Sequence, residues 1–371
     1  MDPLTRDNWL DPQSIPRSLH QVESLLGTTP ISAGDGARTA RVLREEPAGV
    51  DFSDFCDRTR TDALLVVHGE SIVLERYFGA MEPSARHIVM SVSKSVCGMV
   101  AGVLAASGEL DLAATTASYV PELADGPFGT ATVADLLNMT AVHHYDMDHT
   151  DPDSEVAAED RAAGWRSARP GDPVGSRAFL QQIKSSGVGA HGRDFQYSSA
   201  TTEVLSWVLE RAARTPYARL VSERLWSQVG AEHDAYITVD ALGTPYACAG
   251  IGMTLRDLAR FGRLILDSGR GVIPADWIRQ TFAGGDRSAM AGQPLLEYLP
   301  SGSYRHQWWV TGSGPIYASG LLGQYLWLDP DADLIIAKFS HVPIGADQRS
   351  EHVTGFQAIT RALLERRVGR A

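Results

Sequence analysis

The sequence contains very little lysine, so each lysine stands out. Of the 33 basic residues only three are lysines, namely Lys94, Lys184 and Lys338. No run of lysine and arginine occurs, and the net charge is −12. A chain with this acidic balance lacks the basic surface that binds phosphates, so we expect no nucleic-acid partner.

Cysteine and long apolar runs are also scarce. The three cysteines, Cys56, Cys97 and Cys248, are scattered and form no C-x-x-C pair, which excludes a disulfide framework. The opening residues, MDPLTRDNWLDP, lack the apolar core of a secretion signal, and no apolar run is long enough to span a bilayer. We therefore expect a cytoplasmic protein that does not bind membranes.

The patterns that are present predict strands near both ends of the chain and helices between them. Residues 63–78 and 324–340 each predict two strands joined by a short turn. An apolar helical pattern runs from about residue 91 to 106, and further helical patterns occupy 200–213 and 215–229. The simplest packing pairs the two hairpins in one mostly antiparallel sheet flanked by helices, which is an α+β fold.

This order of elements also predicts how the chain is divided. Residues 1–60 are expected to form an irregular arm that packs on an α/β domain made of 61–110 and 240–371. Residues 111–239 are expected to form a mainly helical lobe, and the long charged stretch 143–195 within it is expected to be a substrate loop. An active site would then lie between the two parts, where clefts usually form.

The segment IVMSVSKSVCGMV places a serine and a lysine on one turn of the predicted helix. Ser91 stands at the helix start, where unpaired backbone N–H groups gather, and Lys94 projects from the same face one turn later. A serine needs a base to become a nucleophile, and a lysine among apolar residues has reasons to lose its proton. The N–H group at the helix start can also serve as half of an oxyanion hole.

A simpler interpretation of these two residues is that Ser91 caps the helix and Lys94 extends to solvent. For the bare S-x-x-K tetrapeptide that interpretation is favoured. Two observations favour the catalytic one: Lys94 has apolar neighbours, and no other S-x-x-K occurs in the chain. Ser93 and Ser95 are rival hydroxyls, but neither starts the helix.

Two later segments supply the other groups that acyl transfer needs. Tyr197, in FQYSSATTEVL, stands just before a predicted helix, and a cationic lysine beside it would favour its phenolate. It could also be an ordinary core aromatic. In ASGLLGQYLW small residues lead into a strand, so Gly320 is a candidate substrate contact and the Leu321 N–H a candidate oxyanion donor. A turn beside an edge strand is the alternative.

The motifs SVSK and YSS, followed by the glycine-rich strand start, resemble the serine β-lactamase/penicillin-recognising superfamily, in its class C and family VIII esterase branch. Longer segments, among them FQYSSATTEVLSWVLER, TLRDLARFGRLILDSG and GQYLWLDP, look like the 6-aminohexanoate-dimer hydrolases. The resemblance covers roughly residues 60–340 in matching order. It implies a cofactor-free enzyme that cleaves short esters and linear amides through an acyl-serine.

Carried over to this sequence, the resemblance implies that Ser91 is the nucleophile, Lys94 the S-x-x-K lysine and Tyr197 the catalytic tyrosine. It implies an oxyanion hole made of the Ser91 and Leu321 N–H groups. Whether Lys94 or Tyr197 is the primary base stays open. We expect short esters to be better substrates than amides, because an alkoxide leaves more readily than an unprotonated amine.

The resemblance also implies a set of substrate contacts. Asp160 aligns with an aspartate that faces the substrate's amino group, Trp165 aligns with a tryptophan lining the site, and Tyr145 is a further candidate contact. Two positions depart from the family. His149 stands where the family has a tyrosine that closes over the amide, and Cys248 where it has a polar residue. Both departures argue against nylon-dimer activity and leave acyl-enzyme chemistry intact.

The sequence also bears on three other possible functions: a metal site, an acyltransferase and a binding protein. The segment HHYDMDH invites a metal site, but no metal-binding motif matches it, and we expect no metal. An acyltransferase on the same fold stays open, as does a homodimer. A non-catalytic binding protein would be expected to have lost Ser91, Lys94 or Tyr197, and all three are intact. The expected partner is a small ester or amide.

Overall fold

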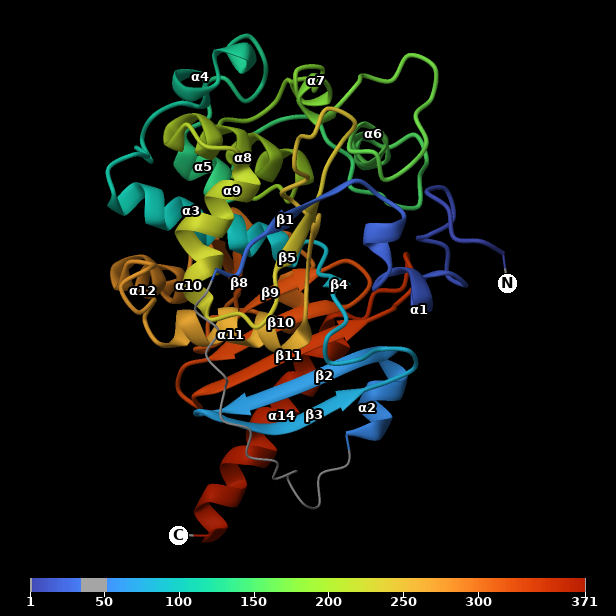
Figure 1. Cartoon of the computed structure of the whole chain (residues 1–371). Helices are drawn as coiled ribbons and strands as arrows, with labels where there is room; N and C mark the ends of the chain where they lie inside the picture. The colour runs from blue at the N-terminus through green and yellow to red at the C-terminus, as the bar shows by residue number, and fades with distance from the viewer. Residues whose placement is uncertain (1, 35–51, 371) are drawn as a thin grey trace.

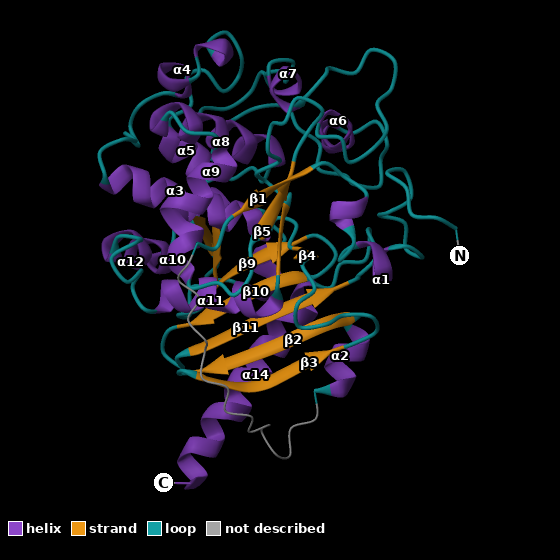
Figure 2. Ribbon diagram, viewed as in Figure 1, coloured by secondary structure: helices purple, strands orange, loops and turns teal. Residues whose placement is uncertain are grey.

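The computed structural model describes residues 2–34 and 52–370, so residues 35–51 of the predicted arm lie outside the described residues. One part of the molecule is mainly helical, the other is a large antiparallel sheet with further helices beside it, and helix α3 (Val92–Ala106) contacts both (Figure 1). The expected α+β class is confirmed, since antiparallel sheets and helices make up the fold together (Figure 2).

The large sheet joins the two ends of the chain. Its strands all run antiparallel to their neighbours. In order across the sheet they are β3 (Ser71–Tyr77), β2 (Thr61–His68), β11 (Leu334–Ser340), β10 (Gln324–Asp329), β9 (Ile316–Gly320), β8 (Trp308–Val310) and β7 (Ser303–Arg305). Because β2 pairs with β11, the predicted pairing of the early and late hairpins is confirmed.

A second sheet of four short antiparallel strands was not predicted. Its order is β1 (Thr28–Ile31), β5 (Ala235–Thr238), β6 (Ile251–Met253) and β4 (His87–Ile88). These strands come from three distant parts of the chain, residues 28–31, 87–88 and 235–253, and β4 ends three residues before Ser91. The second sheet therefore anchors the segment that carries the start of helix α3.

The helices of the described residues are mostly short. The α-helices are α1 (Ile15–Ser18), α2 (Ser53–Arg58), α3, α4 (Thr116–Tyr119), α5 (Val133–Leu137), α6 (Glu155–Ala162), α7 (Ser176–Leu180), α8 (Ser199–Ala213), α9 (Tyr217–Val221), α10 (Ser227–Val229), α11 (Leu255–Leu266), α12 (Ala275–Ala283), α13 (Leu295–Tyr298) and α14 (Arg349–Arg370). Single turns are η1 (Val22–Ser24), η2 (Pro121–Leu123), η3 (Ser222–Trp226) and η4 (Ser288–Met290). The helix predicted at 215–229 is the run α9–η3–α10.

Helices cover both faces of the large sheet. Alternate strand residues, such as Leu326 and Leu328, pack with the apolar face of α11 in one core cluster. The residues between them, such as Trp327, pack with Phe356 of α14 in a second cluster. This alternation explains why the strand segments read as nearly continuous apolar runs, since both faces are buried.

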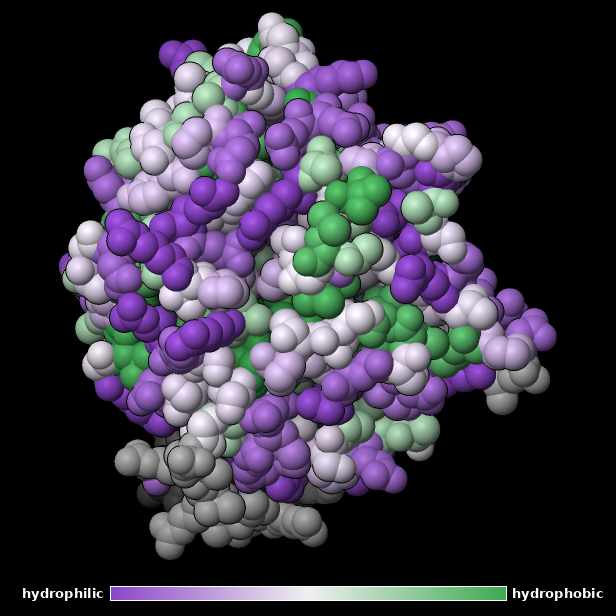
Figure 3. Space-filling model, turned by 45° about the horizontal axis from the view of Figure 1, so that its top comes forward, coloured by the Kyte–Doolittle hydropathy of each residue, from purple (hydrophilic) through white to green (hydrophobic). Residues whose placement is uncertain are grey.

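The surface is mainly polar, with limited apolar patches. The face drawn in Figure 3 is largely hydrophilic, with a band of hydrophobic atoms across its middle. Among the described residues the exposed large hydrophobic side chains are Val174, Val188, Leu242 and Leu364. No helix within residues 2–34 and 52–370 combines the length and the apolar character needed to cross a membrane.

Candidate active site

Ser91 occupies the N-cap position of helix α3, with its side chain half-buried. Its hydroxyl makes no capping hydrogen bond to the helix backbone. The preceding residue, Met90, adopts a left-handed φ of 50°, which costs free energy for a residue other than glycine. The chain thus turns sharply into the helix and leaves the Ser91 hydroxyl unused by local structure.

Lys94 lies beneath Ser91 and is only 1% exposed. Its Nζ donates to the Ser91 hydroxyl at 3.0 Å, to the Cys248 carbonyl at 3.0 Å and to the Ser199 hydroxyl at 3.3 Å. These three acceptors match the three protons of an ammonium group. The interpretation of Ser91 and Lys94 as a cap followed by a solvent-seeking lysine is therefore wrong.

The surroundings of Lys94 act on its pKa in two directions. Burial by itself lowers the pKa of Lys94, but the neighbouring Tyr197, Cys248, Glu159 and Glu203 together raise it above its usual value. The apolar neighbours in the sequence did not reveal these groups around Nζ. The net direction favours the ammonium form of Lys94.

Tyr197, on the segment that enters helix α8, lies over Lys94. The Lys94 Nζ is 5.2 Å from the centroid of the Tyr197 ring. The ring stacks on Trp309 at 5.5 Å and meets Tyr304 edge-on at 6.2 Å. Tyr197 is partly exposed, and its hydroxyl has no hydrogen-bond partner among residues 2–34 and 52–370. Tyr197, Trp309 and Tyr304 form an aromatic wall that holds the Tyr197 ring in place, and the Tyr197 hydroxyl stays available for catalysis.

The end of strand β9 is pressed against the segment that leads into Ser91. A Cβ atom on Gly320 would overlap the Val89 carbonyl oxygen, so only glycine permits this approach. Leu322, just beyond, adopts a left-handed φ of 65°. Within the described part of the chain neither the Ser91 N–H nor the Leu321 N–H donates to an acceptor. Both are free to bind an oxyanion.

The rival hydroxyls of helix α3 are engaged elsewhere. The Ser93 hydroxyl accepts a hydrogen bond from the Ile251 N–H at 3.1 Å, and the Ser95 hydroxyl donates to the Gln307 carbonyl at 2.7 Å. Both serines are buried. Ser91 is thus the hydroxyl of this segment that is both accessible and in contact with Lys94.

Asp160 and Trp165 lie in the wall behind the site rather than freely at its surface. Asp160 is 4% exposed; it accepts a hydrogen bond from the Tyr246 hydroxyl at 3.2 Å, and the Arg166 Nε lies 3.5 Å from its carboxylate. Burial raises the pKa of Asp160 to about 6. The Trp165 ring, also buried, donates to the Thr238 hydroxyl at 3.0 Å.

The two departures from the family pattern have different positions. His149 is partly buried, its Nδ1 has no partner in the described chain, and its pKa is lowered to about 4 by burial and by the charge of Lys94. A neutral imidazole therefore lies near Lys94. Cys248 is fully buried and contacts Lys94 through its backbone carbonyl.

Several groups near Lys94 escaped the sequence analysis. Ser199 and Glu203 lie four residues apart on the same face of helix α8, and that spacing in an apolar helix was the available signal. The Glu203 carboxylate accepts a hydrogen bond from the Cys248 N–H at 2.6 Å. Glu159, fully buried on α6, accepts a hydrogen bond from Tyr145, which explains why Tyr145 faces the interior.

The histidines that invited a metal site do not converge. His143 is buried, and its Nε2 lies 2.8 Å from the Ser198 hydroxyl. His144 points to the surface, where it lies 3.3 Å from Glu155. No cluster of three potential metal ligands occurs among residues 2–34 and 52–370.

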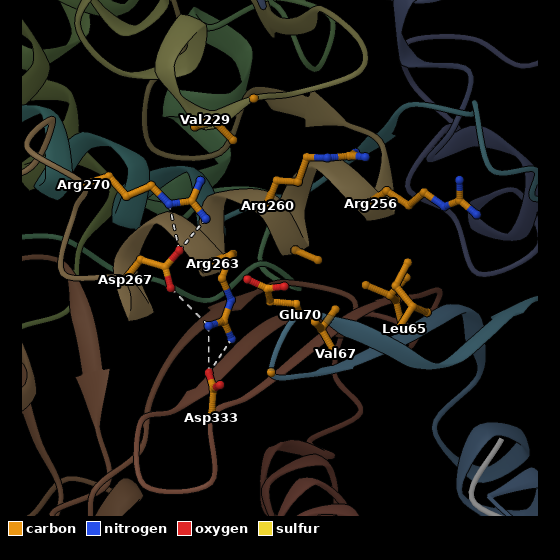
Figure 4. Close-up of a pocket in the computed structure, with 14 residues that line it drawn as sticks. Leu65, Val67, Glu70, Val229, Arg256, Arg260, Arg263, Asp267, Arg270 and Asp333 are labelled. Carbon is orange, nitrogen blue, oxygen red and sulfur yellow. Dashed lines mark hydrogen bonds and ion pairs between the residues drawn. The ribbon is translucent and has the colours of Figure 1, made fainter. Parts of the chain in front are cut away.

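A second concave region lies away from Ser91, between helix α11 and the β2–β3 hairpin. This cavity, of about 610 Å³, is lined by four arginines of or near α11 (Figure 4). A chain of ion pairs crosses it, from Arg270 to Asp267, from Asp267 to Arg263 and from Arg263 to Asp333, the last at 2.7 Å. These guanidinium groups are already paired within the chain, and we assign them no ligand.

Comparisons with known proteins agree with this geometry. The family model described as Beta-lactamase matches residues 51–354. The 6-aminohexanoate-dimer hydrolase of Paenarthrobacter ureafaciens is 39% identical to this chain over 364 residues, which covers 95% of this chain and 91% of that protein.

Solved structures share the fold. The structure of a proposed 6-aminohexanoate-dimer hydrolase from Bacillus anthracis superimposes with a TM-score of 0.87 at 26% identity, covering 98% of this chain and 99% of that one. EstCE1, described as a hydrolase with promiscuous acyltransferase activity, has a TM-score of 0.66 at 15% identity, with 83% and 96% covered, and shows the fold alone. The chain belongs to the beta-lactamase family and is a serine hydrolase homologous to the 6-aminohexanoate-dimer hydrolases.

Proposed function

We propose that this enzyme hydrolyses short carboxylic esters, and linear amides of the 6-aminohexanoate-oligomer type more slowly, through an acyl-Ser91 intermediate. One observation carries the proposal. An uncapped serine hydroxyl contacts a buried lysine at 3.0 Å, and unbonded backbone N–H groups lie at both Ser91 and Leu321. A nucleophile, a cation and two oxyanion donors are the groups that acyl transfer requires.

The charge of Lys94 favours Tyr197 as the base. An ammonium ion cannot accept the Ser91 proton, but it stabilises a phenolate at Tyr197. Tyr197 takes the proton as the Ser91 Oγ attacks the carbonyl carbon, and the oxyanion accepts hydrogen bonds from the Ser91 and Leu321 N–H groups. Tyr197 then protonates the leaving alkoxide or amine, and water repeats the sequence to release the acid.

The surroundings of the site favour esters over amine-terminated amides. The Asp160 carboxylate, which the resemblance assigns to a substrate amine, is shared with Arg166 at 3.5 Å and with Tyr246 at 3.2 Å. A substrate amine would compete with a cation of the chain itself. Amide cleavage also needs protonation of a poorer leaving group, and His149, neutral at pH 7, replaces the family tyrosine there.

The test is mass spectrometry of the enzyme after reaction with an alkyl fluorophosphonate, together with hydrolysis of p-nitrophenyl butyrate. We expect one adduct on Ser91, and loss of both adduct and at least 10³-fold of the activity in Ser91→Ala. Ser95→Ala is the matched control: it removes a buried hydroxyl of the same helix and should keep the adduct. Full activity in Ser91→Ala would refute the proposal.

Acyl transfer to an alcohol or amine is the second outcome to distinguish. The products of p-nitrophenyl butyrate cleavage should be measured with and without added methanol or butylamine. We expect butyrate as the main product in both cases; an excess of methyl butyrate or of N-butylbutyramide would make the enzyme an acyltransferase. A panel with a linear amide and a cephalosporin then ranks the substrate classes.

A further inference from the structure

A buried carboxylate stands behind the lysine of the site and has no part in the steps above. Glu203, on helix α8, is 2% exposed. Its Oε1 accepts a hydrogen bond from the Cys248 N–H at 2.6 Å, and the carbonyl of the same residue accepts from Lys94 at 3.0 Å. Ser199, one turn earlier on α8, contacts Lys94 at 3.3 Å. Two residues on one face of α8 therefore support Lys94: Ser199 contacts it directly, and Glu203 reaches it through Cys248.

Burying a carboxylate is costly unless a compensating charge lies nearby. The titratable groups that face Glu203 come from several elements. They are Lys94 and Cys97 on α3, Tyr217 on α9, Arg177 on α7, Glu159 on α6, Asp240 and Cys248. Arg177 is itself paired with Glu210. Lys94, by contrast, has no acidic side chain of the described residues within ion-pair distance, and Glu203 reaches it through Cys248.

Resting on the proposed function, we propose that Glu203 is a positioning residue for acylation. It holds the Cys248 main chain, whose carbonyl accepts a hydrogen bond from Lys94. Its negative charge keeps Lys94 an ammonium ion while Tyr197 acts as the base. The carboxylate acts through Lys94 and touches no substrate. A glutamine here would keep an acceptor for the Cys248 N–H but lose the charge.

Two carboxyl groups near Lys94 differ in how they titrate, which gives the proposal a control. Burial raises the pKa of Glu203 to about 7, so it carries charge from neutral pH upward. Burial and the neighbouring Glu203 raise the pKa of Glu159 well above its usual value, and its carboxyl group accepts a hydrogen bond from Tyr145 instead of from the residue that Lys94 binds. Replacing Glu159 by glutamine should therefore disturb Lys94 less than replacing Glu203 does.

The scarcity of lysine allows a direct measurement. With ¹³Cε-labelled lysine the enzyme should give three side-chain signals, and Lys94→Met identifies the one from Lys94. We expect the wild-type Lys94 signal to remain that of an ammonium from pH 6 to 10. In Glu203→Gln it should titrate at least about one pH unit lower than in the wild type, because the carboxylate that favours the ammonium form of Lys94 is lost.

Kinetics provide the second readout. We expect the alkaline limb of kcat/KM for p-nitrophenyl butyrate to move by the same amount in Glu203→Gln, which is about a tenfold loss at a pH on that limb, with KM nearly unchanged. Glu159→Gln should move this limb less than Glu203→Gln does. Glu203→Ala should lose more activity than Glu203→Gln, because it also releases the Cys248 N–H.

The outcomes separate this inference from the proposed function. If the wild-type enzyme forms no fluorophosphonate adduct on Ser91, the proposed function fails, while the Lys94 titration still tests Glu203. If the adduct forms but Glu203→Gln leaves the Lys94 signal and the pH profile unchanged, Glu203 has only a structural role and the inference is wrong. An equal shift in Glu159→Gln would also overturn the assignment to Glu203.

Discussion

At the scale of single residues, removing the hydroxyl of Tyr197 tests directly whether this residue is the catalytic base. Tyr197→Phe removes one oxygen that has no hydrogen-bond partner in the described chain and keeps the ring against Trp309. We expect kcat for p-nitrophenyl butyrate to fall by about 10²–10⁴-fold, the usual worth of general acid–base catalysis, with little change in KM. The melting temperature should not change.

Tyr304→Phe is the matched control, because Tyr304 belongs to the same aromatic wall and its ring centroid lies 6.2 Å from that of Tyr197. It should keep both activity and stability. Retention of wild-type kcat in Tyr197→Phe would transfer the role of base to Lys94, which would then have to deprotonate despite its raised pKa.

The sequence predicted the position of Lys94 but not its charge state. One helical turn separates it from Ser91, so their contact followed from helix geometry alone. The direction of its pKa shift depends on groups that lie far away in the sequence, Tyr197 and Cys248 first and then Glu159 and Glu203. Such long-range neighbours leave no local pattern, so the sequence left open whether Lys94 or Tyr197 is the base. The buried position of Asp160, beside Tyr246, was hidden in the same way.

At the scale of elements, helix α3 packs against the turn between strands β7 and β8. A Cβ atom on Gly98 would overlap the His306 carbonyl oxygen. His306 and Gln307 both adopt left-handed φ values, 51° and 68°, so this turn has little freedom to retreat. Gly98 therefore permits a close approach between helix α3 and this turn, one turn beyond Lys94.

Gly98→Ala separates helix propensity from packing. Propensity alone predicts a gain of about 1 kcal/mol in the free energy of unfolding, because alanine favours helices over glycine. The overlap with the His306 backbone predicts a loss of roughly 1–3 kcal/mol instead. We expect the loss, measured as a lower urea midpoint with an unchanged slope. A variant as stable as the wild type would contradict the packing argument.

Elements with strong periodicity were predicted well, and short elements were not. The two hairpins and helix α3 are confirmed. The four-stranded sheet was missed, because its strands have two to four residues and two of its three pairings, β1 with β5 and β4 with β6, join distant parts of the chain. A strand such as His87–Ile88 is too short for alternation to show.

At the scale of the whole molecule, a second lysine is fully buried far along the chain from the site. Lys338, on β11, contacts the Thr59 carbonyl at 3.3 Å and His352 at 3.3 Å, and its ammonium lies 5.6 Å from the Phe55 ring centroid. Burial lowers the pKa of Lys338 to about 7, against the opposing charges of Cys56, Asp62 and Glu351. No acidic side chain in the described residues lies within ion-pair distance of it.

The sign of the resulting pH dependence follows from proton linkage. An unfolded lysine titrates near 10.4, so between pH 7 and about 10 the unfolded state binds more protons and the stability contributed by this group rises with pH. Below pH 7 both states are protonated and the full cost of burying the charge is present. At 1.36 kcal/mol for each pH unit, this cost reaches roughly 4–5 kcal/mol.

Lys338→Met removes the buried charge and keeps most of the volume. We expect the variant to be more stable than the wild type at pH 6, and the difference in unfolding free energy to shrink steadily as the pH rises from 7 to 9.5, measured by urea unfolding. The gain will fall short of the full cost because Thr59 and Ser340 lose a donor. Lys184→Met, at an exposed lysine, should show no such trend. A difference that does not vary with pH would mean that Lys338 keeps an ordinary pKa through hydration of its ammonium group.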